Sequence, residues 1–186
     1  MAKFLRRTPF PLEYDGIKCE IDGGDRRDLI ASTLRSHGGI RFPDKIARDL
    51  SKNLDKLNAG QGWNTTLKWV NALVSPAKAK EERKVARFLQ EKLNGFGPKQ
   101  SRNLLQSLGL TRYEIPIDSR ITKWLNDLGF PMTLTATALA DAGYYEFVLD
   151  GIQELCAASG VLPCVLDAAI FASFDGNAWT PENTIY

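Results

Sequence analysis

The feature that most constrains the fold is a glycine-rich turn between two runs of apolar residues at helical spacing. These runs are Val85, Phe88, Leu89 and Leu93 before the turn, and Leu104, Leu105 and Leu108 after it. Gly95 and Gly97 allow backbone conformations that are closed to residues with a Cβ, and Phe96 offers an apolar anchor between them. The pattern therefore predicts two short helices joined by a five-residue turn.

The start of the second helix is a candidate anion site. Free N–H groups at a helix start, together with the positive end of the helix dipole, bind a phosphate oxygen well. Such a contact holds a nucleic-acid backbone without regard to its sequence. The residues from Gly95 to Gly97 are therefore candidates for DNA-backbone binding.

Lys99 stands at an unusual place for a cation. Pro98 suits the first position of a helix, which puts Lys99 in the first turn. There the ammonium group opposes the helix dipole at a cost of about 0.3–1 kcal/mol, which favours the neutral amine. Since a neutral amine is a nucleophile, Lys99 is a candidate catalytic residue, and a solvated lysine is the ordinary alternative.

Asp118 lies nineteen positions after Lys99 and opens another predicted helix. The apolar face of that helix is formed by Ile121, Trp124, Leu125 and Leu128. Aspartate is a preferred N-cap, so capping alone would explain Asp118 at about 1 kcal/mol. If the two helices pack back to back, however, their N-termini lie on one side, and Lys99 and Asp118 face one cleft.

Residues 93–120 resemble the helix-hairpin-helix DNA glycosylases, and within them the bifunctional 8-oxoguanine DNA glycosylase/AP lyases, archaeal-type members above all. In that family a Leu-x-Gly-hydrophobic-Gly hairpin precedes a lysine nucleophile, and an essential aspartate follows about nineteen residues later. The resemblance implies that Lys99 is the nucleophile, that Asp118 is its carboxylate partner, and that Gly95, Phe96 and Gly97 form the phosphate-binding hairpin. Asn94 differs from the proline that is common there.

A second match lies in residues 166–171. Archaeal-type members carry a Leu-Asp-x-x-x-Trp helix, whose Asp and Trp contact the extruded base. The resemblance assigns this role to Asp167 and Phe171. Phe171 can stack on a purine but lacks the indole N–H, and a surface carboxylate and a core aromatic are the ordinary alternatives.

The resemblance implies an all-α fold of two helical subdomains with a cleft between them, and a base-excision repair enzyme. A monomeric enzyme of this kind would flip a damaged base, 8-oxoguanine as the first candidate, out of double-stranded DNA. It would release the base through a lysine Schiff base and nick the strand by β-elimination. No cofactor is implied, although such hairpins often hold a monovalent cation. Two alternatives stay open: a non-catalytic DNA-binding module, and an enzyme of the same fold acting on oxidised pyrimidines or abasic sites.

Positive charge is concentrated around the hairpin. Residues 78–123 hold eleven Lys and Arg against five Asp and Glu, whereas residues 124–186 hold eight acids and no Lys or Arg. Such a distribution is typical of a nucleic-acid footprint, and also of solvated helix faces. Arg102 and Arg120 are predicted to contact phosphates near the two helix starts.

The sequence predicts no metal site and no membrane segment. Cys19, Cys156 and Cys164 lack CxxC spacing, so they cannot build the four-cysteine iron–sulfur cluster of endonuclease III-type relatives. His37 has no companion ligand. Since no stretch is long enough to span a bilayer, we expect a cytoplasmic or nucleoid/nuclear, DNA-associated protein.

Helical patterns dominate the rest of the chain. We expect an N-terminal helical segment, residues 1–75, and a hairpin subdomain with C-terminal helices, residues 76–186. Helices are predicted from Pro43, over about 144–158 and over 163–174, with a short strand pair near Ile17–Ile21. The tryptophans Trp63, Trp69 and Trp179 are expected in the core, with base stacking at a cleft as the alternative.

Overall fold

The computed structural model describes residues 7–17, 25–75 and 77–175, and in these ranges it is all-helical, with nine α-helices and no strand. The all-α prediction is therefore confirmed. The predicted strand pair is wrong at Ile17, which ends a helix, and its other residues lie outside the described ranges, as do Cys19 and Trp179. The chain divides into two compact units between Trp63 and Asn64.

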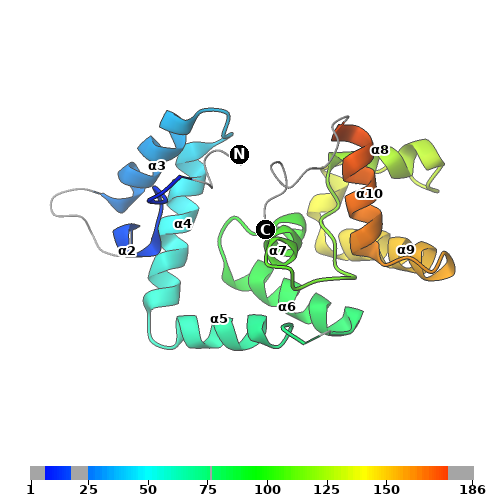
Figure 1. Ribbon diagram of the computed structural model, residues 1–186, viewed down its shortest axis with the longest axis horizontal. Coiled ribbons are helices and arrows are strands. Elements are labelled where there is room, and N and C mark those ends of the chain that lie inside the picture. The colour runs from blue at the N-terminus through cyan, green and yellow to red at the C-terminus, as the bar shows by residue number, and fades with distance from the viewer. Residues whose placement is uncertain (1–6, 18–24, 76, 176–186) are drawn as a thin grey trace. The chain divides into compact units, whose positions relative to one another are not determined.

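The first unit contains α2 (Tyr14–Ile17), α3 (Arg26–His37) and α4 (Pro43–Asn58), shown in blue to cyan in Figure 1. Proline at the first position of α4 fits its missing N–H, as the sequence predicts. The buried core of this unit is formed by Ile17, Ile30, Ala31, Leu34, Ala47 and Leu54. Trp63 donates a hydrogen bond to Asn58 Oδ1 at 2.8 Å and meets the ring of Tyr14 edge-on, so it is a packing residue here.

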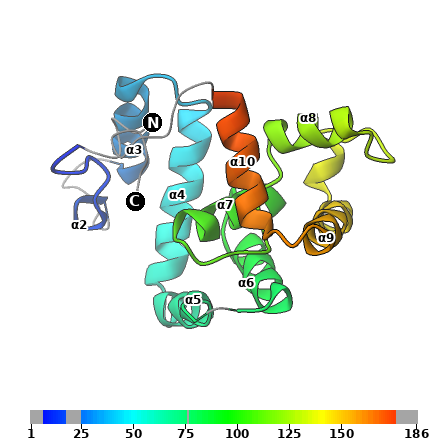
Figure 2. The ribbon, with the colours of Figure 1, turned by 45° about the vertical axis from the view of Figure 1, so that its right-hand side comes forward.

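The second unit holds the candidate site. Its helices are α5 (Gly62–Asn71), which begins at the division, α6 (Ala79–Lys92), α7 (Pro98–Ser107), α8 (Ser119–Leu128), α9 (Ala142–Ala158) and α10 (Pro163–Asp175). A single 3₁₀ turn spans Ala138–Ala140. Figure 2 shows α10 beside α8 and α9, against which it packs.

Two apolar clusters hold these helices together. The first joins α6 to α7 through Leu73, Val85, Ala86, Leu89 and Leu105. The second is larger, with Ile115, Ile117, Ile121, Leu125, Tyr145, Val148, Leu149 and Ile152 among its buried members. Ile115 and Ile117 belong to the extended segment that runs from α7 to α8, so burial of alternate residues fixes this segment just before Asp118.

No single helix in the described ranges is long and apolar enough to cross a membrane; α9 and α10 together reach that length and composition, but they are bent by 96° at their junction.

Candidate active site

The turn between α6 and α7 has the predicted length, since α6 ends at Lys92 and α7 begins at Pro98. Gly95 has φ +78°, a left-handed conformation that residues with a Cβ rarely adopt. Gly97 is different, because its φ of −81° is open to any residue, and the expectation that Gly97 needs an unusual backbone is wrong. A Cβ at Gly97 would meet nothing within 4 Å and would enter open space beside the pocket described below.

Lys99 is the second residue of α7 and is exposed. In the part of the chain that the structure describes, no hydrogen bond or ion pair reaches its Nζ. Pro98 occupies the first helical position, as predicted, and Gly97 precedes it as the N-cap without a side-chain cap. The first backbone N–H groups of α7 are therefore not capped by a side chain of the N-cap residue.

Asp118 is the N-cap of α8. Its Oδ1 accepts the backbone N–H groups of Arg120 at 2.8 Å and Ile121 at 3.1 Å. Its Oδ2 accepts Nε and Nη2 of the Arg120 guanidinium at 2.8 and 2.5 Å. Burial alone would raise the pKa of Asp118, but these hydrogen bonds from Arg120 and Ile121 hold it below its ordinary value. The carboxylate is therefore ionised at neutral pH.

One pocket of about 740 Å³ is lined by both Lys99 and Asp118. The starts of α7 and α8 both open into it, through Gly97 to Gln100 and through Asp118 and Ser119. It is also lined by Tyr145 and by residues of the segment before α9, which are Leu134, Thr135, Ala136, Leu139 and Ala140. The structure thus brings the two predicted catalytic residues to one cavity of a size that binds small organic groups.

The side chains predicted to contact the base lie beside Asp118, but they do not line this pocket. Arg120 extends from Asp118 over the ring of Phe171, with 4.0 Å between its Cζ and the ring centroid. Asp167 accepts a hydrogen bond from Gln106 Nε2 at 2.5 Å. Burial and the nearby negative charge of Asp118 raise the pKa of Asp167, against the opposing effects of Gln106 and Arg120.

The prediction that Arg102 contacts a DNA phosphate is wrong. It is 0% exposed, so it cannot contact a phosphate from the solvent. Its Nε donates to Glu114 Oε2 at 2.8 Å, and Glu114 is also 0% exposed. The pattern suggested a surface arginine because it lies in a basic helix, but α7 is turned so that this position faces the segment between α7 and α8.

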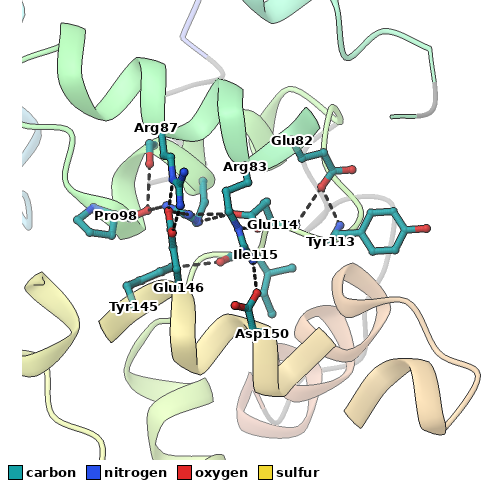
Figure 3. A network of polar contacts seen from close by, with 12 residues as sticks. Glu82, Arg83, Arg87, Pro98, Tyr113, Glu114, Ile115, Tyr145, Glu146 and Asp150 are labelled. Atoms are coloured by element: carbon teal, nitrogen blue, oxygen red, sulfur yellow. Dashed lines mark hydrogen bonds and ion pairs between the residues drawn. The ribbon is translucent and has the colours of Figure 1, made fainter. Parts of the chain in front are cut away.

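A buried polar network, which sequence reasoning missed, holds that segment in place (Figure 3). The carboxylate of Glu82 on α6 accepts the backbone N–H groups of Arg112, Tyr113 and Glu114 at 2.8–2.9 Å. Arg83 donates to Glu114 at 2.8 Å and pairs with Asp150 on α9 at 2.6 Å. These contacts fix the chain a few residues before Asp118. No local sequence pattern predicts these hydrogen bonds and ion pairs, because each joins residues far apart in the sequence.

No group of three or more His, Cys, Asp or Glu side chains that could hold a metal ion occurs among the residues described. Carbonyl oxygens are the ligands that hard cations take, and the turn contains Leu93 and Gly95, whose carbonyls receive no hydrogen bond from the described chain.

Comparison of the chain with protein-family models, with curated proteins and with solved structures found no match.

Proposed function

We propose that this chain is a bifunctional DNA glycosylase and AP lyase of base-excision repair, with 8-oxoguanine in double-stranded DNA as its first candidate substrate. One observation carries the proposal: Lys99 and Asp118, which start two different helices, line the same pocket. Lys99 is exposed and has no acidic partner in the described chain, so its amine is accessible to a substrate. The concentration of Lys and Arg in residues 78–123 supports a polyanionic partner.

In the proposed reaction the turn and the start of α7 bind a phosphate, and the damaged nucleotide rotates out of the duplex. The neutral amine of Lys99 attacks C1′ of the deoxyribose, and the bond between C1′ and the base breaks with its electron pair leaving on the base. The Asp118 carboxylate, ionised at neutral pH, stabilises the positive charge that develops on the sugar. The nitrogen loses a proton, and the C1′–O4′ bond opens with a proton delivered to O4′, which gives the Schiff base. Loss of a proton from C2′ then forms the C2′=C3′ double bond as the C3′–O bond breaks and the 3′ phosphate leaves.

Asp167 and Phe171 are the proposed contacts to the extruded base. The Arg120 guanidinium lies on the ring of Phe171, so a base that stacks on this face must displace it. The Gln106 amide occupies one oxygen of Asp167 and leaves the other for a base N–H. A monovalent cation at the hairpin would be held by the turn carbonyls and would add positive charge beside a bound phosphate.

Borohydride trapping tests the proposal. The protein is incubated with duplexes that carry 8-oxoguanine, oxidised pyrimidines or an abasic site, and the imine is reduced to a stable adduct. We expect a covalent adduct with the wild type that is lost in Lys99→Gln. Lys84→Gln, which removes an exposed lysine from α6, is the matched control for lost charge and should trap normally. The lesion that traps fastest identifies the substrate.

A second candidate, a non-catalytic DNA-binding module, is favoured by the contacts of Asp118. Capping of α8 and pairing with Arg120 account for all four of the hydrogen bonds to its carboxylate without any catalytic role. Under this alternative no duplex gives an adduct, while undamaged DNA binds the wild type and Lys99→Gln with affinities that differ only by one phosphate contact.

A further inference from the structure

We propose that Arg102 and Tyr145 are positioning residues that set the placement of Lys99 relative to Asp118. Together they form a connection, the Arg102–Tyr145 brace, which runs from the residue before Lys99 to the residue before Asp118 through the interior of the second unit. Figure 3 labels Pro98, Glu114, Ile115 and Tyr145, which belong to this connection. The inference rests on the proposed function, because it assigns the brace to the catalytic pair of that function.

The first arm of the brace is Arg102. Its Nη1 donates a hydrogen bond to the carbonyl oxygen of Pro98 at 3.0 Å. Its Nε donates to Glu114 Oε2 at 2.8 Å, and Nη2 lies 2.7 Å from the same oxygen. The guanidinium therefore ties the first turn of α7, which carries Lys99, to the segment that leads to Asp118.

The second arm is Tyr145 on α9, which is 0% exposed. Its hydroxyl donates to the carbonyl oxygen of Ile115 at 3.0 Å and accepts the backbone N–H of Ile117 at 2.6 Å. Ile117 immediately precedes Asp118, so one hydroxyl group fixes the backbone on which the carboxylate is carried. Burial strongly raises the pKa of Tyr145, and the hydroxyl stays protonated and able to make both contacts.

The two arms meet inside the protein. The Arg102 guanidinium lies over the Tyr145 ring, with 4.7 Å between Cζ and the ring centroid, a cation–π contact. Tyr145 also lines the pocket that holds Lys99 and Asp118. A shift of either arm is thus transmitted to one wall of the pocket and to the starts of both helices.

Other contacts also hold this part of the chain. Glu82 already binds the backbone of residues 112–114, and Glu114 Oε1 already receives Arg83 at 2.8 Å and Gln153 at 3.2 Å. A buried arginine–carboxylate pair gives little net stability compared with apolar side chains of similar volume. What Arg102 adds is a link to Pro98, and what the Tyr145 hydroxyl adds is a link to Ile117.

Tyr145→Phe is the sharpest variant, because it removes one hydroxyl and keeps the ring under Arg102. Tyr144→Phe on the same helix is the matched control, since within the described ranges the Tyr144 hydroxyl has no hydrogen-bond partner. We measure the single-turnover rate of borohydride trapping on saturating abasic-site duplex, the DNA dissociation constant, hydrogen exchange of the Ile117 amide, and the amide resonances of Lys99 and Asp118.

We expect Tyr145→Phe to slow trapping by about 10- to 100-fold, because a misplacement of about 1 Å at a reacting group costs up to that factor. DNA affinity should be unchanged, Ile117 should exchange faster, and Tyr144→Phe should match the wild type. An unchanged trapping rate in Tyr145→Phe overturns the inference and leaves the proposed function intact. Should Tyr145→Phe fail to fold, Arg102→Lys, which keeps the charge but not the planar fork, answers the same question.

If the wild type traps no DNA, the proposed function fails, and the resonances decide the inference separately. Movement of both the Lys99 and Asp118 amides in Tyr145→Phe supports a brace between the two helix starts. A change confined to Ile117 shows that the hydroxyl has only a local role and overturns it.

Discussion

The guanidinium of Arg120 pairs with Asp118 from only two residues away, and both of its hydrogen bonds go to the oxygen that does not cap α8. The two carboxylate oxygens therefore have different roles: Oδ1 caps α8, and Oδ2 binds the Arg120 guanidinium. Asp118 is 16% exposed in its side chain and Arg120 37%, so solvent screens the pair only in part.

Replacing Arg120 with Gln should make the stability of the protein less dependent on pH in the acid range. The folded pKa of Asp118 lies below its unfolded value of about 3.9, so the stabilisation is complete above that value and is lost as pH falls through the folded pKa. We expect Arg120→Gln to lose about 0.5–1 kcal/mol of unfolding free energy at pH 7, and progressively less as the pH falls through the folded pKa of Asp118. Urea denaturation at pH 7 and at a series of acid pH values measures this.

Lys123→Gln is the control for that experiment. Lys123 pairs with Asp127 on the same helix, but their side chains are 61% and 63% exposed. Exposed pairs of this kind give at most a few tenths of a kcal/mol. A loss at pH 7 as large as that of Arg120→Gln would show that the partial burial of the Asp118–Arg120 pair is irrelevant.

Asp118→Asn separates the capping role of this residue from its proposed catalytic role. Asparagine caps helices as well as aspartate does, so the fold should be retained, whereas Asp118→Ala should cost about 1 kcal/mol. Without a negative charge beside the sugar, base release by Asp118→Asn should slow by about 100- to 1,000-fold. Single-turnover base release and thermal unfolding are measured on both variants, and wild-type turnover in Asp118→Asn would remove this residue from the mechanism.

Glu82→Gln should destabilise the second unit. The carboxylate accepts three backbone N–H groups, and a glutamine amide directs an NH₂ at one or more of these donors, which leaves it unpaired in the interior. The expected cost is about 1–3 kcal/mol. Glu91→Gln, at an exposed position on the same helix, should be neutral. Chemical denaturation of both variants checks the difference, and equal stabilities would contradict the assigned role of Glu82.

Alanine at Gly95 and alanine at Gly97 should behave differently. Gly95→Ala forces a Cβ into a left-handed backbone at φ +78° and should cost about 1–2 kcal/mol. Gly97→Ala meets neither a clash nor an unusual φ, so its stability should match the wild type. Under the proposed function, however, its methyl group would stand where a phosphate approaches the start of α7. Thermal unfolding together with DNA binding by anisotropy tests both, and normal DNA binding by Gly97→Ala would place the phosphate elsewhere.

Local patterns predicted the elements that carry the candidate site. The apolar spacing and Pro98 located α7, the two glycines located the turn, and Asp118 marked the start of α8. These features depend on backbone conformation and helix capping, which act within a few residues. The residues that determine these helix starts and this turn are therefore close together in the sequence.

The contacts of the charged side chains could not be predicted in the same way. Whether Arg102 faces solvent or the interior depends on the rotation of α7 against residues 110–118, and its partner Glu114 looks like an ordinary acid in the sequence. Similarly, nothing in the pattern pairs Gln106 with Asp167, or places Arg120 on Phe171. These contacts follow from tertiary packing between helices far apart in the chain.

The ion pairs inside the second unit would also change how its basic segment, residues 78–123, meets the proposed polyanionic partner. Arg83, Arg87 and Arg102 are each paired with a carboxylate, on Asp150, Glu146 and Glu114. The other positive side chains of residues 78–123 are mainly lysines, whose compact ammonium groups stay strongly hydrated. Attraction to a nucleic acid should consequently release fewer counterions than the residue count implies, and its dependence on ionic strength should be correspondingly shallow.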